Sequence, residues 1–472
     1  MRRHFVSVLL LVPFAVLALS IPAARSQARQ PAQEAKQALR LPKIIGSHMV
    51  LQRDTELPIW GWAAPGDKVA VRFAGSEAAA TADGAGKWMV RLPAMKAGGP
   101  HKLTVTGGKS GKIELEDILI GEVWLCSGQS NMAWRVGRAD NSKAEIAAAN
   151  HPRIRLFDVQ KVQKPKVADD VGGRWQVCTP KSVEPFSAVA YFFGLKIQEA
   201  LGVPVGLINA SVGGSPIQPW TAAKGYELVE EFAEGKLDKP PQGGMYNGMI
   251  APIVPLPIRG ALWYQGESNV KEGWAYNARM KALIAGWRAA WGRGDFPFYF
   301  VQLAPYAYYP VGMLPPFWEA QTATLTVPNT GMAVITDLVT NLKDIHPPAK
   351  RPVGERLALW ALAGAYGRKG VVFSGPMYKS MTVKGGKIII EFDHVGGGLA
   401  SRDGKELTHF QIAGADKKFF PAKAVIVGGT VEVSSEKVTQ PAAVRFAWEN
   451  TAQPNLVNKE HLPACPFRTD RW

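Results

Sequence analysis

The chain has 472 residues, of which 47% are hydrophobic and 20% are charged, and its formal net charge is +16. This composition is that of an ordinary globular protein and excludes a disordered or fibrous chain, while the length predicts two to four domains. The lysines and arginines are scattered along the chain rather than clustered, so the positive charge does not indicate a nucleic-acid partner.

The first 26 residues have the pattern of a secretory signal peptide. Arg2 precedes an apolar core at residues 5–21, and small residues follow where a signal peptidase would cut. We therefore expect export to the periplasm or out of the cell, with residues 27–40 as a leader or linker. Because the apolar core is short, we expect no integral membrane span after signal cleavage.

Residues 41–117 are predicted to form an N-terminal β domain. Short apolar runs alternate with turns rich in Gly, Pro and Asp, a spacing typical of a small sandwich. The expected strands are 49–52, 57–62, 68–73, 87–92 and 101–105. No catalytic pattern stands out in this region.

Residues 118–373 alternate between strand and helix patterns, which predicts an α/β domain. The expected strands are 123–126, 205–210, 258–264, 298–303 and 332–337, and the expected helices are 187–201, 276–291 and 353–366. Three of the strands end in loops rich in Gly, Ser and Asn. Such loops indicate a parallel sheet with one functional edge.

Residues 374–472 return to short strands separated by Gly- and Lys-rich turns, and they predict a second β-sandwich. Because the two β regions flank the α/β domain, we expect this sandwich to include chain from the N-terminal β region. The predicted order along the chain is therefore β, α/β and β.

Ser130 is the first candidate catalytic residue. It follows a short apolar strand, and Asn131 can begin a helix, so Ser130 is expected on a tight turn between the two. A serine there exposes its hydroxyl, and its backbone N–H can point at a developing oxyanion. No Gly stands two residues after Ser130, so the α/β-hydrolase elbow is a poor match. This stretch alone leaves open the alternative that Ser127 and Ser130 only cap a helix.

A serine nucleophile needs a base, and His346 is the histidine best placed to supply one. It lies in a loop between a predicted strand and a predicted helix, with Asp344 two residues upstream. One turn can bring that carboxylate to the imidazole, and its charge should raise the pKa of His346 above about 6.5. The alternative is a capping Asp beside a surface His. Polar loops gathered in one domain favour the catalytic interpretation.

The chain contains three cysteines: Cys126, Cys178 and Cys465. An odd number cannot form a complete disulfide framework, and Cys126 is expected to be a small buried hydrophobe. No spacing of Cys and His suggests a zinc site, so we expect no metal.

Four short blocks together carry a resemblance to a known family. They are Gly-Gln-Ser-Asn-Met at 128–132, Ser-Val-Gly-Gly-Ser at 211–215, Trp-Tyr-Gln-Gly-Glu-Ser-Asn at 263–269 and Asp-Ile-His at 344–346. This set resembles the SGNH hydrolase superfamily and, within it, the sialate O-acetylesterase family and related carbohydrate acetylesterases. The resemblance covers nearly the whole mature chain. It implies a three-layer α/β/α hydrolase domain with flanking β-sandwich regions.

The resemblance also implies roles for individual residues. Ser130 would be the nucleophile, His346 its base and Asp344 the group that orients the base. Gly214 would donate a backbone N–H to the oxyanion. The third block departs from the Gly-x-Asn-Asp of the broader superfamily, so a side-chain donor to the oxyanion could be either Gln265 or Asn269. No metal or organic cofactor is implied.

The expected function is that of an exported serine esterase that removes O-acetyl groups from carbohydrates. Sialic acid is the substrate that the family name implies. Two alternatives stay open: an acetylesterase acting on a plant polysaccharide such as xylan or xyloglucan, and a non-catalytic glycan-binding protein. The sequence does not indicate the oligomeric state.

Overall fold

The computed structural model describes residues 9, 11, 38–240 and 243–472. The predicted signal peptide and most of the predicted leader therefore lie outside the described residues. From residue 38 onward the described chain belongs to one compact unit, and the domain bounds at 41–117, 118–373 and 374–472 stay predictions. In the described part of the chain, no helix is both long enough and apolar enough to cross a membrane.

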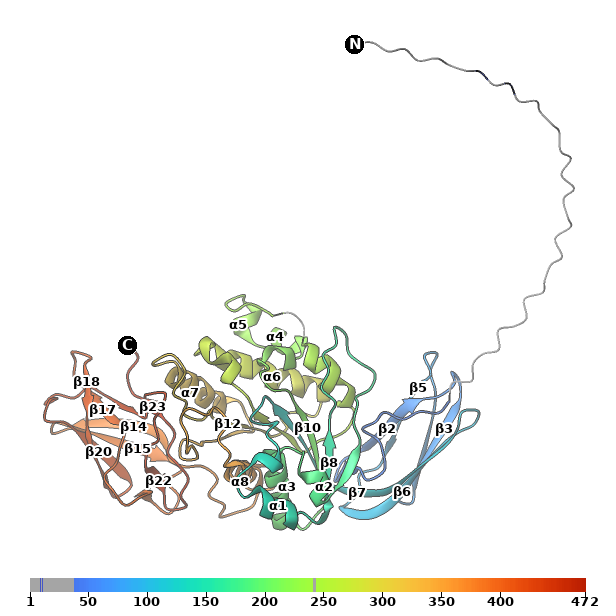
Figure 1. Ribbon diagram of the computed structural model, residues 1–472, viewed down its shortest axis with the longest axis horizontal. Helices are drawn as coiled ribbons and strands as arrows, with labels where there is room; N and C mark the ends of the chain where they lie inside the picture. The colour runs from blue at the N-terminus through green and yellow to red at the C-terminus, as the bar shows by residue number, and fades with distance from the viewer. Residues whose placement is uncertain (1–8, 10, 12–37, 241–242) are drawn as a thin grey trace, which may run out of the picture. The chain divides into compact units, whose positions relative to one another are not determined.

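A large mixed sheet runs through the centre of this unit, and its strands follow the order β13-β12-β11-β7-β10-β8-β9 (Figure 1). All are parallel to their neighbours except the edge strand β9. Strands β10, β11 and β12 are buried along their whole length, as expected for a sheet covered on both faces. The bounds are β7 (Gly111–Gly128), β8 (His151–Asp158), β9 (Trp175–Cys178), β10 (Val205–Ser211), β11 (Gly260–Tyr264), β12 (Phe298–Val301) and β13 (Thr330–Ala333).

Strand β7 is the point at which the chain changes sides in this sheet. After β7 the chain builds β8, β9 and β10 on one side and then β11, β12 and β13 on the other. Ser211 of β10 and Tyr264 of β11 both pair with Gly128, so the three strands end level with one another. A Cβ at Gly128 would lie 2.1 Å from the carbonyl oxygen of Tyr264, and the φ of 139° also requires glycine. Ligands in open α/β sheets bind at such a switch point.

Two groups of helices pack on the central sheet. Helices α3 and α8 contact each other and the strands β10, β12 and β13, while α6 contacts α4 and α7. In Figure 1 the two groups lie on opposite sides of β10 and β12. Helix α3 begins where the Ser187 side chain accepts a hydrogen bond from Ala190 N, and it ends at left-handed Gly202. The helices are α1 (Ser142–Ala148), α2 (Pro180–Val183), α3 (Ala188–Leu201), α4 (Ala223–Glu227), α5 (Glu230–Ala233), α6 (Ala275–Trp291), α7 (Leu314–Ala323) and α8 (Lys350–Trp360).

Most expected elements of the α/β region are present, with shifts at some ends. The last strand lies at 330–333 rather than 332–337, because the chain already turns at Thr336. His151 opens strand β8, which the sequence pattern missed. Short 3-10 or π turns complete the region: η1 (Val136–Arg138), η2 (Gln218–Trp220), η3 (Tyr246–Ile250), η4 (Ala251–Ile253), η5 (Glu267–Glu272), η6 (Thr324–Thr326) and η7 (Ala361–Ala365).

The N-terminal β region is continuous with the central sheet. Strands β1 and β6 pair directly with β7, and β3 and β4 extend that sheet further, while β2 and β5 form a separate pair. Strand β7 therefore runs straight through the expected boundary at 117/118, and one hydrophobic core serves both regions. The bounds are β1 (Val50–Gln52), β2 (Leu57–Trp62), β3 (Lys68–Phe73), β4 (Ser76–Thr81), β5 (Lys87–Leu92) and β6 (Gly98–Gly107).

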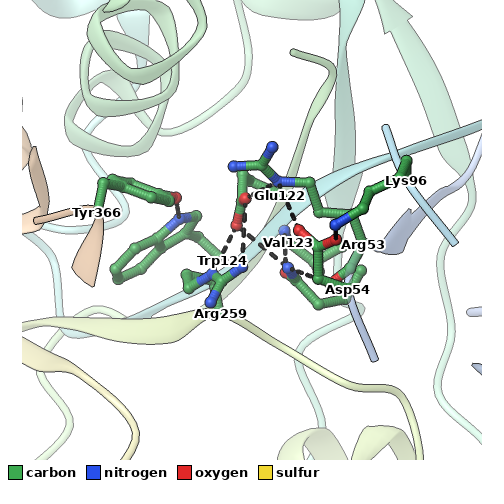
Figure 2. Close-up of polar contacts among 9 residues, drawn as sticks. Arg53, Asp54, Lys96, Glu122, Val123, Trp124, Arg259 and Tyr366 are labelled. Atoms are coloured by element: carbon green, nitrogen blue, oxygen red, sulfur yellow. Dashed lines mark hydrogen bonds and ion pairs between the residues drawn. The ribbon is translucent and has the colours of Figure 1, made fainter. Parts of the chain in front are cut away.

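A buried ionic network joins these regions at Glu122 of β7. The Glu122 side chain is fully buried and accepts hydrogen bonds from Arg53, from Arg259 Nε at 2.8 Å and from Gln52 Nε2 at 3.1 Å. Figure 2 shows both arginines pointing toward Glu122, one from the chain after β1 and the other from the chain before β11. A buried carboxylate is tolerated only when paired in this way.

The C-terminal β region forms sheets of its own around a separate hydrophobic core. Its sheets draw all their described strands from residues 377–468, so the expectation that N-terminal strands join them is wrong: those strands pair with β7 instead. The bounds are β14 (Met377–Lys384), β15 (Lys387–Asp393), β16 (Leu399–Ser401), β17 (Phe410–Ala413), β18 (Phe419–Pro421), β19 (Lys423–Val427), β20 (Thr430–Ser434), β21 (Ala443–Phe446), β22 (Leu456–Asn458) and β23 (Phe467–Arg468).

Candidate active site

Ser130 lies in the turn that follows β7, at the switch point of the sheet. A hydrogen bond from Ala133 N to Gln129 O closes this turn. The expected helix at Asn131 is absent, because the chain stays in turns and the first α-helix begins only at Ser142. Ser127 belongs to β7 itself, so neither serine caps a helix and the capping interpretation is wrong.

The structure brings Ser130 and His346 together. His346 Nε2 lies 2.8 Å from Ser130 Oγ, within hydrogen-bond distance, although the two residues are 216 positions apart. The loop between β13 and α8 carries His346, as predicted from the sequence. Trp134 stacks on the imidazole with 5.1 Å between ring centroids and 17° between the planes, which fixes the orientation of the ring. A hydroxyl paired in this way with an imidazole can act as a nucleophile.

Asp344 lies beside His346 but does not hydrogen-bond its ring. Asp344 Oδ1 accepts a 2.8 Å hydrogen bond from the backbone N–H of His346, and it lies 3.7 Å from the ring Nδ1. The second distance is too long for a hydrogen bond. The carboxylate therefore shapes the loop directly and acts on the imidazole through its charge.

The pKa of His346 is lowered from its ordinary value, so the expectation that it would be raised is wrong. Partial burial is the largest cause, because it disfavours the charged ring, and the positive charge of Lys350 adds to the effect. The charge of Asp344 opposes both and is outweighed. A neutral imidazole is the form that accepts a proton, so this environment extends the working range of a base toward lower pH.

The loop after β10 lies beside the serine. A Cβ at Gly213 would lie 3.6 Å from Ser130 Cβ, and Gly214 has a left-handed φ of 71°. Among the described residues, the N–H groups of Ser130, Gly213 and Gly214 have no hydrogen-bond partner. Gly213, which the sequence interpretation passed over, lines the pocket beside Ser130. These N–H groups are suited to hold an oxyanion.

Neither expected side-chain donor reaches this pocket. Gln265 is fully buried, and its Nε2 donates to Asn269 Oδ1 at 2.7 Å and to Gln129 Oε1 at 3.1 Å. Asn269 Nδ2 in turn donates to Gln218 Oε1 at 3.0 Å and to Glu272 Oε1 at 2.8 Å. The two amides thus tie the loops after β10 and β11 together, and their donors are already used.

A pocket of about 300 Å³ opens over the serine and the histidine. Its lining contains three exposed cationic side chains and no acidic residue. Such a lining favours an anionic ligand. The sequence interpretation missed these cations, although two of them, Arg135 and Arg138, lie within six residues of the end of the nucleophile block. The lining residues are Ser130, Ala133, Trp134, Arg135, Arg138, Lys161, Gly213 and His346.

Beside this pair lies a polar cluster that the sequence interpretation also missed. Asn131 Nδ2 donates to Glu267 Oε1, and Lys350 Nζ donates to Asn131 Oδ1. Asn131 and Glu267 stand inside the first and third blocks, so their place in the motifs was a usable signal. Lys350 belongs to no block, and only the fold brings it to the site.

The remaining candidates for chemistry are inert or absent. Cys126, Cys178 and Cys465 are free and buried, and burial raises the pKa of the Cys178 thiol to about 12. They therefore pack as small apolar side chains, as expected for Cys126. Within the described ranges, no group of three or more His, Cys, Asp or Glu residues is arranged to hold a metal ion.

Comparison with known proteins gives a family. Residues 120–363 match the family model of carbohydrate esterases described as sialic acid-specific acetylesterase. The human sialate O-acetylesterase is 30% identical to this chain over 481 residues, covering 91% of this chain and 92% of that protein. The mouse sialate O-acetylesterase is also 30% identical, over 72% of this chain and 76% of its own length.

A solved structure extends the similarity to the whole fold. The crystal structure of a carbohydrate acetylesterase from Xanthomonas citri has a TM-score of 0.86 and 41% sequence identity to this chain. It covers 92% of this chain and 100% of its own. The chain therefore belongs to the sialic acid-specific acetylesterase family of carbohydrate esterases, which are carboxylic ester hydrolases.

Proposed function

We propose that this chain is an exported serine esterase that removes O-acetyl groups from carbohydrates, with Ser130 as nucleophile and His346 as base. The observation that carries the proposal is the 2.8 Å distance from His346 Nε2 to Ser130 Oγ at the carboxyl end of β7. The relatives' names, sialate O-acetylesterase and carbohydrate acetylesterase, support the acetyl ester as the bond that is cleaved.

The reaction follows from these positions. Ser130 Oγ attacks the acetyl carbonyl while His346 Nε2 takes the hydroxyl proton. The tetrahedral oxyanion accepts hydrogen bonds from the N–H of Ser130 and from the N–H of Gly214 or its neighbour Gly213. His346 then returns the proton to the departing sugar oxygen, and water hydrolyses the acetyl-enzyme by the same steps in reverse.

Asp344, Gln265 and Asn269 have supporting parts in this scheme. Asp344 holds the backbone of the His346 loop and stabilises the imidazolium that forms during the reaction. Gln265 and Asn269 fix the loops that present the backbone donors. The parallel order of the sheet and the two groups of helices support the three-layer SGNH arrangement for the α/β region.

Among acetylated sugars, we favour a sialoside. Arg135, Arg138 and Lys161 line the pocket with positive charge, and a sialic acid carries a carboxylate that they can bind. A neutral acetylated polysaccharide such as xylan or xyloglucan has no group that needs these cations. That alternative, and a non-catalytic glycan-binding protein, are the outcomes to test against.

The test is acetate release from three substrates by the purified mature protein. An O-acetyl sialoside should have a higher kcat/KM than acetylated xylan or acetylated xyloglucan. Arg138→Gln should raise KM for the sialoside and leave hydrolysis of neutral p-nitrophenyl acetate unchanged, whereas Arg72→Gln, in the exposed pair with Glu77, should change neither. Faster acetate release from a neutral polysaccharide would overturn the assignment of a sialoside as substrate and would leave the assignment as an esterase intact.

The class of enzyme and its export are tested separately. A fluorophosphonate should label Ser130 and abolish activity, and EDTA should leave activity intact. No acetate release together with an unlabelled Ser130 would favour the glycan-binding alternative. If EDTA inhibits the enzyme and added zinc restores activity, the serine mechanism is wrong and a zinc-dependent mechanism takes its place. After cell fractionation, the protein should be recovered outside the cytoplasm with an N-terminus close to residue 27, and recovery in the cytoplasm with Met1 retained would contradict export.

A further inference from the structure

Lys350 is a buried cation close to the proposed nucleophile and base, and the reaction scheme above does not use it. It is the first residue of α8 and only 1% of its surface is exposed. Its Nζ donates a 2.5 Å hydrogen bond to Asn131 Oδ1. Among the described residues it forms no ion pair within 4.0 Å, so the amide oxygen is its direct polar partner.

Asn131 connects the two loops that carry the chemistry. It directly follows Ser130, and its Nδ2 donates to the carbonyl oxygen of Ile345 at 3.0 Å, the residue before His346. The same Nδ2 donates to Glu267 Oε1. The Asn131 amide thus links the loop of Ser130 to the loop of His346 and to η5, and Lys350 holds the amide oxygen.

The surroundings leave the charge of Lys350 poorly screened. Its Nζ lies 5.2 Å from the ring centroid of Tyr264 and 5.7 Å from that of Trp134, the ring that stacks on His346. The hydroxyl of Tyr264 and the Oε2 of Glu267 are buried without a described hydrogen-bond partner. A charge in such a setting acts more strongly on its neighbours than it would in water.

The titration behaviour agrees with this geometry. Burial lowers the pKa of Lys350 to about 7, and burial raises the pKa of Glu267. The Lys350 charge is also one of the causes that lower the pKa of His346. The other charged groups around the base are Asp344 on its own loop, Glu267 on η5, Asp140 on the loop before α1, and Arg135, Arg138 and Lys161 at the pocket.

We propose that Lys350 is a positioning residue for the esterase: through Asn131 it holds Ser130 against His346, and its buried positive charge acts on the imidazole of His346, which stacks on the Trp134 ring close to Lys350 Nζ. The proposal rests on the proposed function. The proposal gives a structural reason for the presence of a cation, Lys350, as well as a carboxylate, Asp344, near His346. Because Lys350 does not itself line the pocket and is not hydrogen-bonded to Ser130 or His346, it acts through Asn131 and through its electric field.

The test compares Lys350→Met with Arg351→Met. Each variant removes one positive charge from the first turn of α8, but Arg351 is paired with Glu145 and Glu355 away from Ser130. His346 is titrated by NMR in isotope-labelled protein, with the signal assigned from His346→Gln. In parallel, kcat/KM for p-nitrophenyl acetate is measured against pH. We expect Lys350→Met to move the His346 titration and the acid limb of activity to higher pH, and Arg351→Met to move neither.

The bridging role has its own readout. Asn131→Ala removes the amide and keeps the lysine, so kcat should fall by on the order of 10²-fold, the cost of a misplacement of about 1 Å. KM should change little, because Asn131 does not line the pocket. An unchanged kcat would overturn the positioning role.

Two results would overturn the electrostatic role. One is a His346 titration that is the same in Lys350→Met and in the wild type. The other needs no variant: a wild-type His346 that titrates above the ordinary value of about 6.5. If Lys350→Met does not fold, Lys350→Gln replaces it. Fluorophosphonate labelling of Ser130 separates this proposal from the proposed function, since labelling with an unchanged titration contradicts only the role of Lys350.

Discussion

Two glutamates lie near opposite ends of the β7 segment that pairs with β10, residues 122–128, and they are held in opposite ways. Toward the amino end, Glu122 accepts hydrogen bonds from two arginines and a glutamine, so both of its carboxylate oxygens have partners (Figure 2). Beyond the carboxyl end, Glu267 accepts a hydrogen bond from Asn131, and its Oε2 is buried without a described partner. A buried carboxylate whose oxygens all have hydrogen-bond partners stabilises the fold. A buried carboxyl group with an unpaired oxygen instead perturbs the pKa values of the groups around it.

The difference explains where chemistry is located. Both ends of this segment are buried beside one hydrophobic core and lie on one sheet, so the scaffold is shared. Only the carboxyl end combines a backbone turn, free N–H groups and titratable side chains with perturbed pKa values. At the amino end, Arg53 and Arg259 connect Glu122 to the chain after β1 and to the chain before β11, and this connection has a structural role.

The largest expected effect tests the carboxyl end. Ser130→Ala should lower kcat/KM by about 10³-fold or more, because the nucleophile is lost, and His346→Ala should match it, because the hydroxyl is weak without its base. The melting temperature of each variant should stay close to that of the wild type. Ser127→Ala is the control with a mild effect. A folded Ser130→Ala enzyme with near wild-type turnover would remove Ser130 from its role.

The second effect tests the amino end and should appear in stability. Glu122→Gln should destabilise the protein by about 3–5 kcal/mol, since two arginines lose a buried partner. The activity of the folded fraction should stay unchanged. Glu77→Gln, which breaks the exposed pair with Arg72, should cost about 1 kcal/mol or less. Equal melting temperatures for the two variants would erase the contrast between a buried network and a surface pair.

The third effect is smaller because Asp344 does not hydrogen-bond the imidazole. In Asp344→Asn the side-chain oxygen can still accept from the backbone N–H of His346, and only the charge is lost. We expect kcat to fall on the order of tenfold, less than the ~10² to 10⁴-fold contributed by general base catalysis itself. A loss as large as that of His346→Ala would mean that the carboxylate reaches the ring during the reaction.

The smallest effect is a displacement of the pH profile. His346 must be neutral to act, and its pKa is lowered from the ordinary value of about 6.5, so kcat/KM should hold below that pH and fall only as the ring is protonated at lower pH. A rate profile on a substrate without titratable groups measures this. An acid limb centred above 6.5 would mean that Asp344 outweighs burial and Lys350.

Much of this site was predictable because its signals are local. The strands β7, β10 and β11 show as apolar runs, and the polar loops after them are visible in the same few residues. The Asp-x-His pattern at 344–346 falls between a strand and a helix that the spacing also predicts. Strand periodicity and turn residues depend on neighbours in the chain, so these features can be recognised without the fold.

From the sequence alone we predicted most strands and helices of the α/β region, the three polar loops, and Ser130 and His346 as partners. Tertiary structure alone decided that β7 runs through the expected domain boundary, that no helix follows Ser130, and that the donors of Gln265 and Asn269 are used elsewhere. It also decided the sign of the pKa shift of His346. The reason is distance along the chain: Lys350 meets Asn131 across 219 positions, and burial and charge at a site depend on whatever the fold brings there.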